Sequence, residues 1–255
     1  THNYGQIQVL PPRAFEDMVG IEFTTYIYLR RNKINETFCN TFTGEKTHGL
    51  RSLNLDSNKL NIFPNTSALT NLYSLSVSDN RIIFVPASHI PPSLKTLHIT
   101  NNLITCLPLA VFNVIPSPHY VFIGDTSEPR ITEFPCSFTS VYYILNVYGY
   151  MNDSIEPCDP FSIYPNLRTL AVSYGNLVLF PSLKFAGNLN SLELRNNKIY
   201  LLPNVTQIPM ENKLKSIDVS YNDIEAIPSH FFVNMNKLEE LKIGNNKIKV
   251  LFNPA

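Results

Sequence analysis

Aliphatic residues recur at fixed spacings along most of the chain. Residues 50–64, LRSLNLDSNKLNIFP, carry aliphatic side chains at positions 1, 4, 6 and 11 of the stretch and an Asn at position 9, and residues 72–86 repeat this arrangement. Further clear copies begin at Leu94, Leu167, Leu189, Leu214 and Leu238. Because self-similarity at a fixed period of roughly 20 to 50 residues is the signature of stacked units, the repeat itself predicts the architecture.

Weaker copies fill the rest of the chain. The third and fourth clear copies start 73 residues apart (94 to 167), which leaves room for two more, near Pro118 and Tyr142, each with extra residues after its strand. The stretch YIYLRRNKI at 26–34 is another weak copy, and IQVLPPRAF at 7–15 matches the second half of one. We expect a single solenoid over 1–255, with about nine full repeats plus a partial N-terminal one and both ends uncapped.

Each copy, which we term a coil, assigns physical roles to its positions. Alternation at positions 4 and 6 is typical of a strand with one buried face, so positions 2, 3, 5, 7 and 8 are expected to project from the sheet or its rim. Asn at position 9 can satisfy backbone groups where the chain turns away from the strand. Pro at position 15 ends the regular stretch because it lacks an amide donor. One coil cannot bury its own apolar face, so neighbouring coils must stack.

Spacing, residue types and period together resemble the leucine-rich repeat family over nearly the whole chain. The second halves VLPPRAF and AIPSHFF are similar to those of extracellular members such as Toll-like receptors and small leucine-rich proteoglycans. The resemblance implies an α/β solenoid: a right-handed, curved stack with a parallel β-sheet on its concave face and a mostly irregular or short-helical convex side.

Aromatic residues cluster at the variable positions in the middle of the stack. Position 5 reads Asn54, Ser76, His98, Phe122, Asn146, Ala171, Glu193, Asp218 and Lys242. Since aromatic side chains with a polar group are common interface anchors, we predict a ligand-binding site on the concave face formed by His98, His119, Tyr120, Phe122, Tyr143, Asn146, Tyr148 and Tyr174. The alternative is that the weak copies are misaligned by one residue, which would turn Tyr120 and Phe122 into the core.

A second variable column, position 13, is apolar in most coils. Its members are Ile62, Phe84, Cys106, Leu179, Leu201 and Val250, with Val9 and Ala226 at the same position and Glu133 as an interruption. If these side chains are exposed, they form a lateral apolar stripe of the kind that marks an interaction surface. The alternative is that each coil is slightly rotated and buries this position.

Four Asn-x-Ser/Thr sequons suggest a secreted chain or an ectodomain, although some such triplets arise by chance in an Asn-rich sequence. They are Asn35, Asn65, Asn152 and Asn204. Asn65 and Asn204 directly follow the FP or LP of their coils, where the chain heads over the convex side and a glycan has room. The sequence therefore favours an extracellular glycoprotein.

The four cysteines allow one disulfide. Cys136 and Cys158 are 22 residues apart, which is one coil. Neighbouring strands lie about 5 Å apart, close to the Cα separation of roughly 5.5 Å in a disulfide. Cys39 and Cys106 are about three coils apart and cannot reach each other.

Nothing in the sequence indicates catalysis. The six His residues show no metal-ligand spacing, and there is no nucleophile or phosphate-binding motif, so we expect no metal, no cofactor and no enzyme activity. Asp56 and Asp79 lie at adjacent strand ends but are more simply interpreted as solvated acids. Equal numbers of basic and acidic residues, 20 of each, argue against a nucleic-acid partner, and no apolar run is long enough to span a membrane.

Two function classes remain. One is a non-catalytic extracellular recognition module, such as a receptor ectodomain, with a protein or glycoconjugate ligand on its concave face. The other is a structural subunit of an extracellular matrix or filament that self-associates end to end or side to side. The clustered aromatic residues favour the first, and the missing end caps favour the second.

Overall fold

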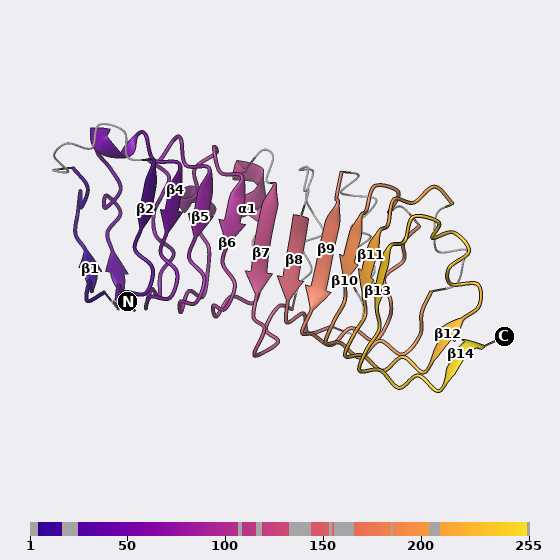
Figure 1. Cartoon of the computed structure of the whole chain (residues 1–255). Helices are drawn as coiled ribbons and strands as arrows, with labels where there is room; N and C mark the ends of the chain where they lie inside the picture. Colours follow the sequence, from indigo (N-terminus) through magenta and orange to yellow (C-terminus); the bar gives the residue numbers. More distant parts are fainter. Residues whose placement is uncertain are drawn as a thin grey trace. The chain divides into compact units, whose positions relative to one another are not determined.

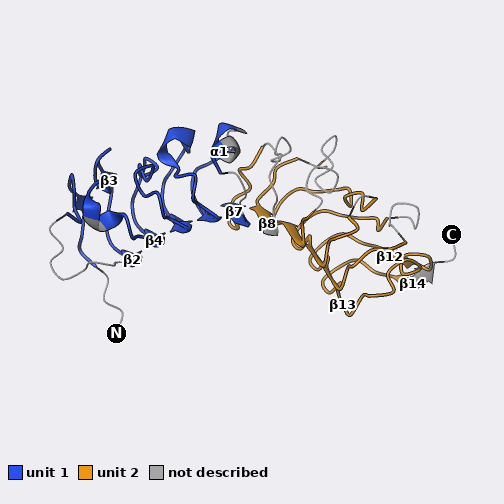
Figure 2. Cartoon of the chain, turned by 90° about the horizontal axis from the view of Figure 1, so that it is seen from above, with its two compact units in different colours: residues 1–123 blue, residues 124–255 orange. Residues whose placement is uncertain are grey.

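The computed structural model divides into two compact units, residues 1–123 and 124–255 (Figure 2). It describes residues 5–16, 25–106, 109–115, 119–132, 144–152, 155, 166–184, 186–203 and 210–253. The two units are described separately below.

Unit 1 is a stack of coils in which each coil contributes one short strand to a parallel sheet (Figure 1). The paired strands, in order, are β2 (Tyr26–Tyr28), β4 (Ser52–Asn54), β5 (Ser74–Ser76), β6 (Thr96–His98) and β7 (Tyr120–Gly124). A separate parallel pair joins β1 (Val9–Leu10) and β3 (Glu36–Thr37). The helical segments are η1 (Glu45–Thr47), η2 (Ala87–His89) and α1 (Leu109–Val114). Figure 2 shows α1 on the side of this unit away from the strands.

Unit 2 repeats this construction. Its strands pair in parallel in the order β8 (Ile144–Tyr148), β9 (Thr169–Ser173), β10 (Ser191–Glu193), β11 (Ser216–Asp218) and β13 (Glu240–Lys242). A second parallel pair, β12 (Ala226–Pro228) and β14 (Val250–Asn253), forms where the coils leave the sheet. The parallel-sheet solenoid predicted from the repeat is confirmed.

The pairing register places the repeat positions as the sequence predicts. Leu97 of β6 pairs with Val121 of β7, and Val121 and Ile123 are 0% and 1% exposed. Tyr120, which alternates with them, is 37% exposed. The alternative in which Tyr120 and Phe122 belong to the core is therefore wrong, and the outward positions 3 and 5 define what we term the sheet face of each unit.

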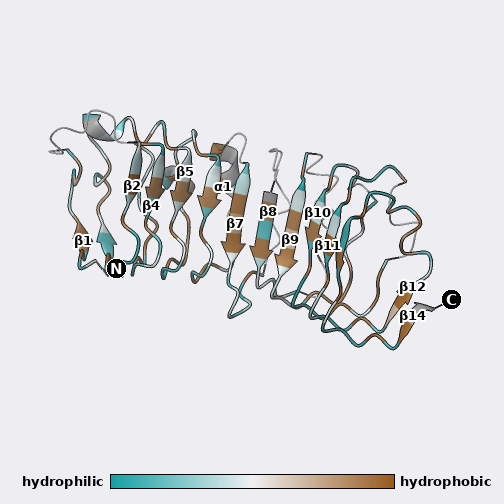
Figure 3. Ribbon diagram, in the orientation of Figure 1, coloured by the Kyte–Doolittle hydropathy of each residue, from teal (hydrophilic) through white to brown (hydrophobic). Residues whose placement is uncertain are grey.

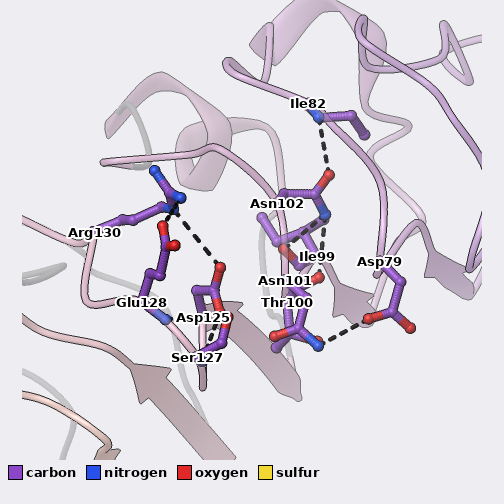
Figure 4. A network of polar contacts seen from close by, with 10 residues as sticks. All are labelled: Asp79, Ile82, Ile99, Thr100, Asn101, Asn102, Asp125, Ser127, Glu128 and Arg130. Carbon is purple, nitrogen blue, oxygen red and sulfur yellow. Dashed lines mark hydrogen bonds and ion pairs between the residues drawn. The ribbon is translucent and has the colours of Figure 1, made fainter.

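Asparagines at position 9 join successive coils by hydrogen bonds. The Asn102 side chain donates to the carbonyl oxygen of Ile99, and its Oδ1 accepts from the Ile82 amide one coil earlier (Figure 4). It also donates to the carbonyl oxygen of Val77. Equivalent bonds to the preceding coil are made by Asn32, Asn58, Asn80, Asn197, Asn222 and Asn246. Position 9 thus satisfies backbone groups that the turn would leave buried and unpaired.

The residue at position 8 has a left-handed backbone in coil after coil. This conformation ends the strand and turns the chain, and side chains other than Gly, Asn and Asp adopt it at a cost. The positive φ angles at this position belong to Arg31, Ser57, Asp79, Asn101, Gly149, Tyr174, Asn196, Tyr221 and Asn245.

Two glycines of unit 2 let backbone segments of that unit approach closely. A Cβ atom on Gly124, which has φ +97°, would lie 1.8 Å from the Tyr148 carbonyl oxygen, and one on Gly149 would lie 2.5 Å from the Asp125 carbonyl oxygen. No other residue type fits such contacts. The turn after Gly124 is closed by Asp125, whose Oδ1 accepts a bond of 2.7 Å from the Ser127 amide (Figure 4).

The electrostatic surroundings of Asp125 keep it ionised. Burial alone raises the pKa of this carboxyl, but hydrogen bonds from Ser127 and Glu128 and the positive charge of Arg130 outweigh it and lower the pKa overall. Arg130 also pairs with Glu128 (Figure 4). The turn after Gly124 is therefore closed by a charged hydrogen-bond acceptor.

Strands β7 and β8, which carry predicted site residues, differ in hydropathy (Figure 3). The middle of β8 is hydrophilic, because its central residue is Asn146, whereas β7 is hydrophobic along most of its length.

Cys39 and Cys106 are free thiols, and the predicted Cys136–Cys158 disulfide lies outside the described residues. Within the described residues, no helix has the length and apolar character needed to cross a membrane.

Candidate ligand-binding face

Two rings stack on the sheet face of unit 1. His98 of β6 and Phe122 of β7 occupy paired positions, and their ring centroids are 4.2 Å apart with an interplanar angle of 7°. Burial in this stack lowers the pKa of His98, although the negative charge of Asp56 opposes the effect. Neutral imidazole is thus the favoured form on this face.

The strand-start edge of unit 1 adds two further aromatic side chains. The Tyr73 hydroxyl lies 3.2 Å from His119 Nδ1, and the His119 ring packs edge-on against Tyr120. The structure therefore brings four predicted residues of unit 1 together on one face, and Tyr73 joins them. The four are His98, His119, Tyr120 and Phe122.

Asp56 orders the strand-end side of the same face. Its Oδ1 accepts from the Ser76 hydroxyl at 2.6 Å and from the Ser78 amide at 2.8 Å, and its Oδ2 accepts from the Asn54 amide group at 2.9 Å. Asp79 instead accepts from the Ser57 hydroxyl. Both acids are therefore engaged with hydrogen-bond donors of the protein, rather than simply solvated.

In unit 2, Asn146 supports a tyrosine rather than facing solvent. Asn146 is only 9% exposed, and its Nδ2 donates to the Tyr148 hydroxyl oxygen at 3.1 Å. Among the described residues its Oδ1 has no hydrogen-bond partner. Burial is the main reason why the pKa of Tyr148 is raised, so its hydroxyl keeps its proton. Tyr143 lies outside the described residues.

Arg195 lies between two tyrosines at the strand-end side of unit 2. Its guanidinium carbon is 5.4 Å from the ring centroid of Tyr174 and 6.0 Å from that of Tyr221. Tyr148 packs edge-on against Tyr174 at 6.3 Å. These contacts join two predicted residues, Tyr148 and Tyr174, to two that were not predicted, and we term Tyr148, Tyr174, Arg195 and Tyr221 the unit 2 cluster.

The missed residues had a recognisable signal. Tyr221 occupies position 8, as Tyr174 does, and Arg195 occupies position 7 of the intervening coil. If position 8 had been compared down the stack as position 5 was, Tyr174 and Tyr221 would have stood out as the two aromatic residues of a mostly small or polar column. The contact of Arg195 with both rings depends on its side-chain conformation, which no column reveals.

The side chains at position 13 are exposed, so the rotated coil that would bury them is excluded. Ile62 and Phe84 of unit 1 are 72% and 56% exposed, and Leu179, Leu201 and Val250 of unit 2 are also exposed. Cys106 is half-buried. In unit 1 the pairing of Val9 with Glu36 puts an acid in this column, an interruption that the sequence analysis missed. The use of the stripe as an interface remains a prediction.

The sequons differ in how free their amide groups are. Asn35 is exposed. The Asn65 amide donates to the Cys39 carbonyl at 3.2 Å, and that of Asn152 donates to the Thr132 carbonyl at 2.8 Å. Asn204 lies outside the described residues. Glycosylation remains a prediction.

Comparisons with known proteins agree with the repeat geometry. A family model described as leucine rich repeat matches residues 212–255. Over this segment the chain matches the leucine-rich repeat family, and the strands of both units share the solenoid fold.

Its similarity to individual repeat proteins is partial. It is 30% identical over 148 residues to the rat leucine-rich repeat-containing G-protein coupled receptor 5, covering 57% of this chain and 16% of the receptor. The solved APL1 leucine-rich repeat domain has a TM-score of 0.66 at 20% identity and covers 97% of this chain and 62% of that one. The LRIM1/APL1C complex gives a TM-score of 0.68 at 21% identity and covers 97% and 44%. These structures show the fold, and the chain spans less than a fifth of the matched receptor.

Proposed function

We propose that the chain is a non-catalytic extracellular recognition module that binds a protein or glycoconjugate ligand on its sheet face. The observation that carries the proposal is the unit 2 cluster, in which Arg195 lies between Tyr174 and Tyr221. Tyr and Arg are the residue types that most often dominate binding energy at interfaces.

Backbone strain supports this proposal. Tyr174 and Tyr221 adopt φ values of 59° and 57°, a conformation that costs about 1–2 kcal/mol for a residue with a side chain. Asp79, Asn101, Asn196 and Asn245 occupy the same position in other coils, where the cost is smaller, although Arg31 and Ser57 also adopt it. Tyr221 remains 50% exposed, so core packing does not repay the strain. Strained residues of this kind are characteristic of functional sites.

Two unpaired polar atoms on the sheet face of unit 2 also support the proposal. Asn146 Oδ1 and Arg195 Nε are buried and lack a hydrogen-bond partner among the described residues. Such atoms are uncommon in folded proteins. A ligand that donates to Asn146 and accepts from Arg195 would satisfy both.

A binding screen with a matched control tests the proposal. The natural protein, displayed as a tetramer, is applied to an array of extracellular proteins and glycans, together with a Tyr174→Ala/Tyr221→Ala variant. We expect the double variant to lose binding while its thermal midpoint stays close to the parent value, since the left-handed strain is kept by Ala. The control is Tyr200→Ala, which removes an exposed tyrosine at position 12. Equal binding by parent and double variant would contradict the proposal.

The alternative function is a structural subunit that self-associates in an extracellular matrix or filament. The observation that favours it is the exposure of Ile62 and Phe84 in unit 1 and of Leu179 and Leu201 in unit 2. Size-exclusion chromatography with light scattering on the natural protein separates the two functions, because the alternative requires assemblies that grow with concentration.

A further inference from the structure

A pocket of about 560 Å³ lies at the strand-start edge of unit 1. Its size is within the range of roughly 300–1,000 Å³ that is usual for small-ligand sites. None of the residues predicted from the sequence lines it. The lining residues are Tyr26, Arg51, Ser52, Asn71, Tyr73, Ser74 and Ser93.

The floor of the pocket is a row of hydroxyl groups. The strand register puts Ser52 beside Ser74, so position 3 of two successive coils presents a serine hydroxyl, and Tyr26 occupies the same position of the preceding coil. Neither Ser52 nor Ser74 uses its hydroxyl in a hydrogen bond to another described residue. These groups are therefore available to both donate to and accept from a ligand.

Arg51 brings an uncompensated positive charge to this row. Within the described residues, its guanidinium has no carboxylate partner. Cations at the same repeat position in unit 2 are engaged: Lys215 pairs with Glu239 at 2.7 Å, and Arg168 donates to Asn188. A free guanidinium can bind a sulfate or phosphate group through two parallel hydrogen bonds.

Tyrosine rings line two sides of the pocket. Tyr26 stacks on Tyr28 at 6.2 Å, and both rings are well exposed. On the other side, Tyr73 is positioned by its contact with His119. Aromatic faces with a polar hydroxyl offer an apolar surface to one side of a sugar ring and a hydrogen bond to its edge.

The backbone at this edge is not free to pair with a peptide. The Arg51 carbonyl accepts from the Tyr73 amide at 2.8 Å, and the Tyr73 carbonyl accepts from the Lys95 amide at 2.8 Å. A peptide that binds by adding a strand would need such groups to align its own backbone. Side-chain hydroxyls spaced along a row suit a polyhydroxylated ligand instead.

We propose that this pocket binds a sulfated sugar residue of an anionic glycan. Arg51 contacts the sulfate, the Ser52 and Ser74 hydroxyls bond the sugar hydroxyls, and Tyr26 packs against the ring. The site lies on the sheet face of unit 1 but uses none of the residues of the unit 2 cluster, which carries the proposed function.

The test is isothermal titration calorimetry on the full chain with heparin-derived and chondroitin sulfate-derived hexasaccharides and their desulfated counterparts. We expect at least one sulfated hexasaccharide to bind and its desulfated form to bind far more weakly. Arg51→Gln should weaken binding by about tenfold or more, as loss of a charge-assisted contact does. Lys215→Gln, at the same repeat position in unit 2, should bind as the parent does. Because Arg51 is exposed, the thermal midpoint of Arg51→Gln should match the parent.

Several results would overturn the assignment. They are the absence of binding to both sulfated hexasaccharides, equal affinity for a desulfated one, unchanged affinity in Arg51→Gln, or an equal loss in Lys215→Gln. Tighter binding of a tyrosine-sulfated peptide at the same residues would show that the ligand is a peptide. The Tyr174→Ala/Tyr221→Ala variant should retain hexasaccharide binding, which separates this site from the proposed sheet-face function.

Discussion

The side-chain oxygen of Asn80 accepts a hydrogen bond of 3.0 Å from the backbone amide of Leu60, one coil earlier. The same side chain donates to the carbonyl oxygens of Leu55 and Val77, so a single amide group satisfies backbone atoms in two coils. All of these groups are buried, and water cannot replace the side chain.

Replacing Asn80 by Ala should therefore destabilise unit 1. Each buried polar group left without a partner costs about 1–3 kcal/mol, so we expect a loss of at least about 2 kcal/mol in the free energy of unfolding. Urea denaturation followed by circular dichroism measures it. Asn61→Ala, at an exposed position of the preceding coil, is the control and should change stability by less than about 0.5 kcal/mol. Equal stability of the two variants would contradict the role given to position 9.

Gly124→Ala should destabilise unit 2 by more than about 2 kcal/mol, because the new Cβ would meet the Tyr148 carbonyl oxygen and the backbone is left-handed. Gly187→Ala is the matched control, since a Cβ there meets no atom within 4 Å. Thermal unfolding of both variants measures the difference. A Gly124→Ala protein as stable as Gly187→Ala would show that Gly124 does not approach the Tyr148 carbonyl oxygen as described.

His98 should make stability depend on pH. Its pKa in the folded chain is lowered by burial, so the unfolded chain binds the proton more tightly. This contribution to stability is complete above the ordinary value of 6.5 and is lost as the pH falls through the lowered folded pKa. We expect the urea midpoint to fall between pH 7.5 and pH 5, and to fall less in His98→Gln. His48→Gln, at an exposed position, is the control, and an identical pH profile for parent and His98→Gln would refute the effect.

The apolar stripe predicts lateral association. Replacing Phe84 by Lys puts a charge into the exposed column at position 13 and should weaken self-association in sedimentation velocity experiments over a concentration series. Arg81→Ala, an exposed change in the same coil, should leave the association unchanged. A parent protein that stays monomeric at every concentration would count against the stripe as a self-association surface.

Glycosylation can be tested at Asn35. This residue is exposed, whereas the Asn65 amide is engaged by the Cys39 carbonyl. After expression in a secretory cell line, we expect intact-mass analysis with and without peptide N-glycosidase F to show a glycan that disappears in Asn35→Gln. An unmodified mass for the parent would remove one argument for an extracellular chain.

The strand register could be predicted from the sequence even in the weak copies. Val121 and Leu145 are buried at position 4 although their coils lack most of the repeat signature, because a shift of one residue would exchange every buried and exposed side chain of a strand. The same rule correctly placed Tyr120 and Phe122 on the sheet face.

The composition of the site could not be predicted to the same degree. Arg195 contacts two tyrosines through its side-chain conformation, which the repeat pattern does not determine. The weak copy that contains Glu36 has no apolar residue at position 13, so Glu36 was not recognised as a member of that column. The positive charge available in the pocket depends on Arg51 having no carboxylate partner among the described residues. Only the three-dimensional structure shows this.

The hydrogen bond between Asn80 and Leu60 has a direction, and so does the whole stack. Where a described coil is followed by one with an Asn at position 9, a backbone amide donates to the Asn of that following coil. During synthesis from the N-terminus, the newest coil therefore carries an unpaired backbone amide until its successor emerges. A ribosome that stalls within the stack would always leave one incompletely bonded coil at the growing end, and a C-terminal truncation would expose the same defect permanently.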